Sequence, residues 1–211
     1  MTSGTTTRGD DVHDQALADQ IAQLLLTRDV QEINFAWGHL TIGPSGFRRV
    51  AEALRSGRLR VYAGGATRGL RAIAAYADKG PQAGPDARSV LLFRRAHPLR
   101  SPDGRAHAVH ECAHAVTALD RAVARTEQEH AAVYVAEAWY RLNVAGCGGV
   151  PILKHGVTAA SYRVAAALRE RSRAAGGTVV SPTAEERVTA VRRHVRRTPE
   201  DEGGFLQRGG L

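Results

Sequence analysis

The first half of the chain alternates between helical and strand-like hydrophobic patterns. From residue 14 to residue 28, apolar side chains recur at intervals of three and four, which predicts an amphipathic helix. The run 33–42 mixes β-branched and aromatic residues and ends before Gly43 and Pro44, which is typical of a strand or of one arm of a hairpin. A short helix and two strands are then predicted at 47–54, 59–63 and 89–93.

The stretch 66–88 follows neither period clearly. Leu70, Ile73 and Ala74 have the spacing of a helix, whereas 79–85 is a loop rich in Gly and Pro. The pattern therefore leaves the secondary structure between the strands at 59–63 and 89–93 open.

The second half of the chain is dominated by helical patterns. Ser101 and Pro102 suit the start of a helix, because Ser caps the first turn and Pro is tolerated there. Thr183 and Glu186 have the spacing of a capping box at the start of the last helix. Four helices are predicted, at about 102–119, 126–144, 157–174 and 183–197.

These elements predict an α+β fold. A chain of 211 residues is long enough to bury one core of ordinary size, and it contains no internal repeat. We expect a single domain over 13–197, with flexible tails at 1–12 and 198–211. In this domain a small N-terminal sheet, with the strand at 89–93 beside the site, packs on the C-terminal helices that carry the candidate chemistry.

The helix predicted at 102–119 contains an H-E-x-x-H motif, formed by His110, Glu111 and His114. Positions four apart lie on one face of a helix about one turn apart, so both imidazoles can bind one Zn²⁺. Glu111 lies beside them and can act as a general base that takes a proton from a metal-bound water. The neighbouring residues are small or apolar, as expected of a buried helix. We therefore predict His110 and His114 as metal ligands and Glu111 as the catalytic base.

The segment 108–140 resembles the active-site region of zincin metallopeptidases, and most closely that of small bacterial gluzincin-like proteins. In those proteins a second helix opens with an acidic residue and continues with Ala-x-Tyr-type residues, as the stretch 127–140 does here. The resemblance rests on one specific motif. It implies a zincin-like fold, a Zn²⁺ cofactor and hydrolysis of a peptide bond.

The resemblance also implies a third metal ligand, a Glu near the start of the second helix. Glu129 is favoured because it precedes the Ala-Ala-x-Tyr stretch and lies 15 residues after His114. Glu127 remains an alternative, although it points elsewhere on the helix. Asp120 is a further alternative, since metzincins place a ligand at that spacing. Thr117 disfavours it, because metzincins have at that position a Gly that turns the chain.

The remaining polar residues near the motif are assigned supporting roles. Glu137 is expected to act indirectly or to lie on the surface, and Cys112 is expected to be a packing residue. Cys147, in a Gly-rich loop, is a weak alternative ligand, and His107 and His130 are expected to be surface groups or partners of the ligands. Four side chains are candidates for stabilising a tetrahedral intermediate: Tyr134, Tyr140, His155 and Tyr162.

Composition narrows the class of protein. With 43% hydrophobic and 24% charged residues, and with no apolar run of membrane-spanning length, the chain is neither a membrane-spanning nor a fully disordered protein. The N-terminus has no apolar signal segment, and two cysteines are too few for a disulfide framework. These features predict a cytoplasmic protein without a membrane partner.

Positive charge adds only a little to the interpretation. The formal net charge is +8, and only two of the 29 basic residues are lysine. The arginines form three clusters on separate segments, and aromatic residues make up only 5% of the chain, so a solvated basic surface is favoured over a nucleic-acid-binding face. The clusters lie at 48–60, 94–105 and 192–197.

The favoured function is that of a zinc metallopeptidase acting on a peptide or protein substrate, with Glu111 as the base. One alternative is a non-catalytic zinc-binding regulatory or interaction protein whose Arg clusters bind nucleic acid or an acidic partner. The intact Glu111 disfavours it, because a purely structural metal site needs the histidines but not the base. Another is a peptidase dedicated to one regulatory protein. The sequence does not define the substrate or the oligomeric state.

Overall fold

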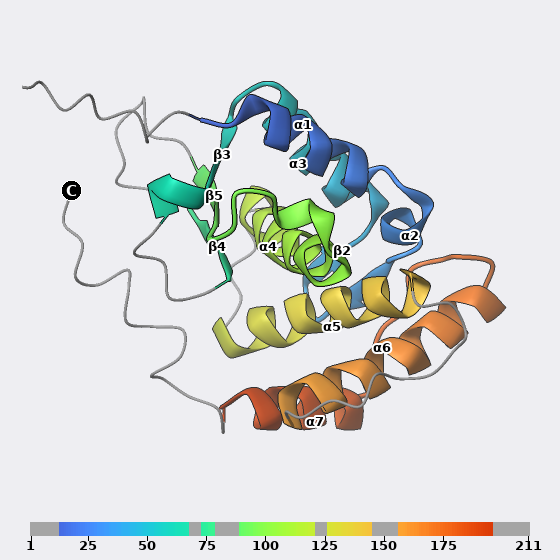
Figure 1. Ribbon diagram of the computed structural model, residues 1–211. Helices are drawn as coiled ribbons and strands as arrows, with labels where there is room; N and C mark the ends of the chain where they lie inside the picture. The colour runs from blue at the N-terminus through green and yellow to red at the C-terminus, as the bar shows by residue number, and fades with distance from the viewer. Residues whose placement is uncertain (1–12, 68–72, 79–88, 121–125, 145–155, 196–211) are drawn as a thin grey trace, which may run out of the picture.

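The computed structural model describes residues 13–67, 73–78, 89–120, 126–144 and 156–195 (Figure 1). Over these residues the chain is α+β, with helices predominating. The helices are α1 Gln15–Leu25, α2 Arg28–Gln31, α3 Pro44–Arg55, α4 Pro102–Leu119, α5 Thr126–Val144, α6 Gly156–Ala174 and α7 Ala184–Val195, with short 3₁₀ helices η1 Gly64–Thr67 and η2 Pro98–Arg100. The strands are β1 Phe35–Trp37, β2 Leu40–Ile42, β3 Leu59–Ala63, β4 Ala74–Ala77 and β5 Ser89–Phe93.

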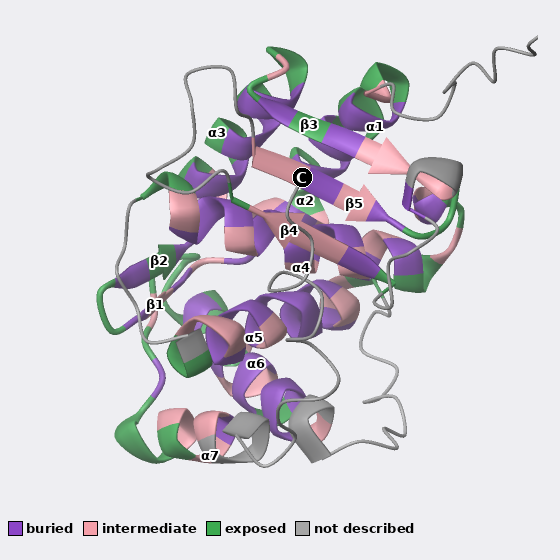
Figure 2. Cartoon of the chain, turned by 90° about the vertical axis from the view of Figure 1, so that its left-hand side faces the viewer, coloured by how far each residue is buried: buried purple, intermediate pink, exposed green. Residues whose placement is uncertain are grey.

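The strands form two small sheets. β1 and β2 are an antiparallel hairpin whose two-residue turn begins at Gly38, with φ of 65°, a left-handed conformation that glycine adopts without strain. The second sheet has the order β3-β5-β4, with β5 parallel to β3 and antiparallel to β4. β4 is an edge strand of this sheet and packs along α4 (Figure 2).

Helix α4 is the centre of the molecule. It contacts α3 on one side and α5 on another, while β2 and β4 cover further parts of its surface. Its small side chains allow close approach: a Cβ placed on Gly46 of α3 would lie 2.5 Å from Cγ1 of Val116. Below α5 the helices α6 and α7 complete the helical layer (Figure 1). A helix covered on so many sides is held in a fixed position, which suits a helix that carries a site.

Most of the elements predicted from hydrophobic spacing are confirmed. The run 33–42 forms both arms of a hairpin instead of one strand, and the stretch 66–88 contains β4 where its residues had suggested helical spacing. β5 is the central strand, so β4 and not the strand at 89–93 lies next to α4. The expected tails at 1–12 and 198–211 lie outside the described residues. Within the described part, no helix is both long and apolar enough to cross a membrane.

The capping box at the start of α7 is also confirmed. The Glu186 backbone N–H donates to Thr183 Oγ1 at 3.2 Å, and the Thr183 backbone N–H donates to Glu186 Oε2 at 2.7 Å. Arg171 of α6 donates to both carboxylate oxygens of Glu186, at 3.0 and 2.8 Å. These contacts hold the pKa of Glu186 below its usual value, with the hydrogen bond from Arg171 as the largest cause.

Replacing Thr183 by Ala should destabilise the protein by about 1 kcal/mol, because the Glu186 backbone N–H loses its capping acceptor. Urea denaturation followed by circular dichroism measures the change. Thr178→Ala is the matched control, since Thr178 is an exposed residue in the preceding connection. Equal effects of the two substitutions would mean that the box does not stabilise α7.

Candidate metal centre

Two rows of polar side chains face each other across the contact between α4 and α5. We call them together the polar seam. The α4 row follows a 4-3-4-3 spacing and the α5 row includes a 4-3-4 spacing, so that each row lies on one helix face. The pairs run antiparallel, with early residues of α4 meeting late residues of α5. The seam consists of Asp103, His107, His110, His114 and Thr117 on α4, and Glu129, His130, Tyr134, Glu137 and Arg141 on α5.

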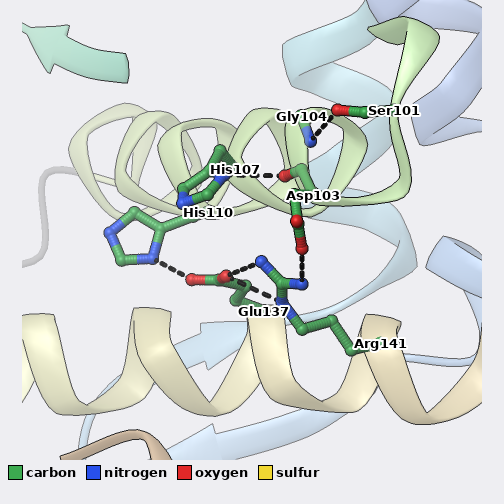
Figure 3. A network of polar contacts seen from close by, with 7 residues as sticks. All are labelled: Ser101, Asp103, Gly104, His107, His110, Glu137 and Arg141. Atoms are coloured by element: carbon green, nitrogen blue, oxygen red, sulfur yellow. Dashed lines mark hydrogen bonds and ion pairs between the residues drawn. The ribbon is translucent and has the colours of Figure 1, made fainter. Parts of the chain in front are cut away.

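His110 is held by a carboxylate of α5. Its Nδ1 lies 3.0 Å from Oε2 of Glu137, while Arg141 donates through Nε and Nη2 to Oε1 of the same carboxylate at 2.9 and 2.8 Å (Figure 3). Arg141 also donates to Asp103 at 2.5 Å. Burial alone would raise the pKa of Glu137, but the hydrogen bond and charge of His110, together with Arg141, outweigh it and lower the pKa to about 2. Glu137 is therefore an ionised acceptor.

His114 is held in the same way one turn further along α4. Its Nδ1 lies 2.9 Å from Oε1 of Glu129, and the Thr117 hydroxyl donates to that same oxygen at 2.9 Å. The hydrogen bond from His114 is the largest cause that holds the pKa of Glu129 below its usual value. Thr117, which the sequence placed at the position of a metzincin glycine, instead continues α4 and orients this carboxylate.

The two carboxylates define which imidazole nitrogen faces a metal. An ionised carboxylate only accepts hydrogen bonds, so Nδ1 of each histidine is the donor. A metal would then bind through Nε2, and in His110 this nitrogen lies on the side of the ring away from Glu137 (Figure 3). Carboxylates that hold the second nitrogen of metal-binding histidines are a general feature of such sites, since they fix the orientation of the ring.

The donor chemistry of the seam fits a zinc ion, although a complete ligand set is not assembled. The rings of His110 and His114 have centres 5.2 Å apart, as befits two imidazoles on one face of a helix. Within the described residues, however, no three His, Cys, Asp or Glu side chains are grouped so that they could hold a metal ion. The structure therefore presents an oriented histidine pair without an assembled third ligand among the described residues.

Glu111, the predicted base, is buried, with 7% of its surface exposed. Its carboxylate makes no hydrogen bond to any residue that the structure describes. Cys112 beside it is completely buried, and this burial raises the pKa of its thiol, so the expected packing role agrees with its position.

The alternatives for the third ligand lie apart from the histidines. Glu127 is exposed. Asp120 is at the C-terminal end of α4 and forms an ion pair with Arg49 of α3. Neither makes a contact with His110 or His114 among the interactions of the described residues. Glu129, the favoured residue, is the one of the three that reaches the pair.

The candidates for stabilising a tetrahedral intermediate are also separated by the structure. The ring of Tyr134 lies 4.7 Å from that of His110, measured between centres. Tyr140 and Tyr162 are buried, so Tyr134 is the tyrosine that stands next to the histidines. His107 contacts the carbonyl oxygen of Asp103 within α4, at 2.7 Å from Nδ1. His155 and Cys147 lie outside the described residues.

Sequence reasoning missed two members of the site. It gave His130 only a general supporting role, yet its ring centre lies 5.0 Å from that of His114. It did not single out Arg141, which neutralises Glu137. The 4-3-4 spacing of His130, Tyr134, Glu137 and Arg141 was visible in the sequence, and it marks a polar face on a helix that is otherwise largely buried.

A small cavity of about 110 Å³ opens near the N-terminal end of α4. Ile73, Phe93 and Pro98 give it an apolar lining, and Arg95 adds a positive charge. His107, one turn before His110, also lines it, so the cavity lies along the helix face that carries the histidine pair.

Comparison of the chain with models of protein families, with curated proteins and with solved structures gives no match. The interpretation of the site therefore depends on its own geometry and chemistry.

Replacing Glu137 by Leu should lower the free energy of unfolding by about 3 to 5 kcal/mol, because it leaves His110 and the partly buried Arg141 without their shared acceptor. Asp103→Asn is the control. Its side chain is 75% exposed, so the loss of its pairing with Arg141 should cost less than about 1 kcal/mol. Urea denaturation of metal-free protein measures both. Similar costs for the two variants would show that Glu137 is not the residue on which the seam depends.

Proposed function

We propose that the protein is a zinc-dependent metallopeptidase with a zincin-like arrangement of its α+β fold. The observation that carries the proposal is the pair His110 and His114, each held through Nδ1 by a carboxylate of α5, beside the buried Glu111. Metal-binding histidines almost always donate their second ring N–H to a carboxylate or another acceptor, and both histidines have such an acceptor here. The combination is the one expected for a metal that activates water.

The histidines would hold Zn²⁺ through Nε2, with a third donor from the first turn of α5. The sequence favours Glu129 for that position, and His130 follows it directly. A bound zinc ion supplies a Lewis acid for the substrate carbonyl and lowers the pKa of a bound water. The proton transfers and the hydrogen bond to the oxyanion are assigned to side chains of the protein.

Glu111 is the general base of the proposed reaction. Its carboxylate takes the proton of the attacking water and then passes it to the leaving nitrogen of the cleaved amide. Glu111 follows His110 directly on α4 and is only 7% exposed, so bulk water has little access to it. We assign to Tyr134, whose ring lies beside that of His110, the donation of a hydrogen bond to the oxyanion that forms.

The surroundings of α4 favour an extended peptide as substrate. β4 is an edge strand beside α4, and an edge strand can bind an extended segment through backbone hydrogen bonds. The cavity at His107 has room for one small apolar side chain, and Arg95 and Asp103 in its lining carry opposite charges. These features support cleavage of a peptide or protein segment.

Protein purified without added metal should contain close to one zinc per chain, because two oriented imidazoles and a third donor form a three-ligand site. Elemental analysis of the full chain measures the content. His110→Ala and His114→Ala should abolish stoichiometric zinc, whereas His39→Ala, in the exposed hairpin turn, should retain it. A wild-type protein that neither contains nor takes up zinc would contradict the proposed function.

Glu111→Gln should keep the zinc and lose at least about a hundredfold in hydrolytic rate, since the amide has the same shape but cannot accept the proton. Turnover of a mixed peptide library, read by mass spectrometry, measures the rate without a known substrate. Glu127→Gln, on the exposed side of α5, is the control and should retain full activity. Zinc lost from Glu111→Gln would make Glu111 a ligand, and unchanged activity would refute its role as base.

A further inference from the structure

Glu129 and Glu137 occupy equivalent positions relative to the two histidines. Glu137 accepts a hydrogen bond from Nδ1 of His110 at 3.0 Å, and Glu129 accepts one from Nδ1 of His114 at 2.9 Å. Both carboxylates come from α5, and both are held by a second donor, Arg141 in one case and Thr117 in the other. Glu137 orients the ring of His110 through Nδ1, on the side of the ring away from Nε2. Glu129 has the same position relative to the ring of His114 and therefore the same orienting role.

We propose that His130 is the third metal ligand and that Glu129 is a positioning residue that acts through His114. The inference rests on the proposed function, since it assumes that His110 and His114 bind zinc. It replaces the carboxylate favoured from the sequence by its immediate neighbour on α5. The resulting ligand set consists of three imidazoles.

The position of Glu129 argues against direct ligation. Its Oε1 is already the acceptor for both His114 Nδ1 and the Thr117 hydroxyl. A carboxylate that binds Nδ1 lies on the opposite side of the imidazole from Nε2, the nitrogen that would bind the metal. Moving Glu129 to the metal would remove the acceptor that fixes His114, so one residue cannot readily perform both tasks.

The spacing of the rings favours His130. Zinc–nitrogen bonds of about 2.0–2.1 Å in a tetrahedral site place the centres of two imidazoles roughly 5.2 Å apart. The centres of His110 and His114 are 5.2 Å apart, and those of His114 and His130 are 5.0 Å apart. Each of these two pairs therefore has the separation of two imidazoles that share one metal.

The register of α5 supports the same choice. His130 continues the row of Tyr134, Glu137 and Arg141 at 4-3-4 spacing, the row that faces α4. Glu129 is rotated by about 100° from this row. The side chain of His130 is half-buried. Since the described residues hold no assembled group of three ligands, metal binding requires the His130 side chain to rotate toward the oriented pair, and α5 already brings its ring next to that of His114.

The test compares zinc affinity in the full-length wild type and four full-length variants by competition with a chromophoric chelator. His130→Ala should lose more than the roughly 10- to 100-fold that loss of an orienting partner costs. Glu129→Gln should lose about tenfold or less, because the Gln oxygen still accepts from His114 Nδ1. Glu127→Gln, two residues away and exposed, should match the wild type. His130→Gln serves as a second substitution, and circular dichroism of the metal-free variants checks that each is folded.

X-ray absorption spectroscopy of the zinc-loaded wild type counts the ligands without any substitution. Three imidazoles support the proposal, and two imidazoles with a protein carboxylate overturn it. Retained affinity in His130→Ala, with large losses in Glu129→Gln, would also overturn it while leaving the proposed function intact. Zinc binding that survives His110→Ala would instead refute the proposed function, and the ligand assignment with it.

Discussion

A carboxylate buried between two helices constrains the arrangement of α4 and α5. Glu137 is 8% exposed, and an ion at such a depth is tolerated only when its oxygens are fully paired. Oε1 is paired with Arg141 and Oε2 with Nδ1 of His110. Sliding or rotating one helix past the other would break the contact of Glu137 with His110 and that of Arg141 with Asp103, so these cross-helix pairs set the register of the polar seam.

The orientation of the histidines follows from this register. Glu137 and Glu129 each accept a hydrogen bond from Nδ1 of one histidine. The rings of His110 and His114 are therefore fixed in one tautomer before any metal binds. α4 itself is held by close contacts such as that of Gly46 with Val116. The proposed chemistry therefore uses side chains whose positions are set by the core, which is the condition for a preorganised site.

The sequence predicted most of the helices and the shared helix face of His110 and His114, because both depend on local periodicity along one segment. It did not predict β4, since Ala74 and its neighbours are small residues whose strand conformation comes from pairing with β5. It left open which residue of α5 meets which histidine, because the choice among Glu129, His130 and Glu137 depends on how α5 is rotated against α4. Rotation of a helix is a tertiary property, and a buried face of Ala and Val residues does not fix it by pattern alone.

The central claim is that Nδ1 of His110 and Nδ1 of His114 each donate a hydrogen bond to a carboxylate of α5, so that Nε2 of each ring is available to bind a metal. Long-range ¹H–¹⁵N correlation spectra of the full-length protein, recorded without and with one equivalent of zinc, identify the protonated and the metal-bound nitrogen of each ring. The claim predicts that in the zinc-loaded protein both rings keep a proton on Nδ1 and bind the metal through Nε2. Binding through Nδ1, or histidine signals that do not change on addition of zinc, would contradict it.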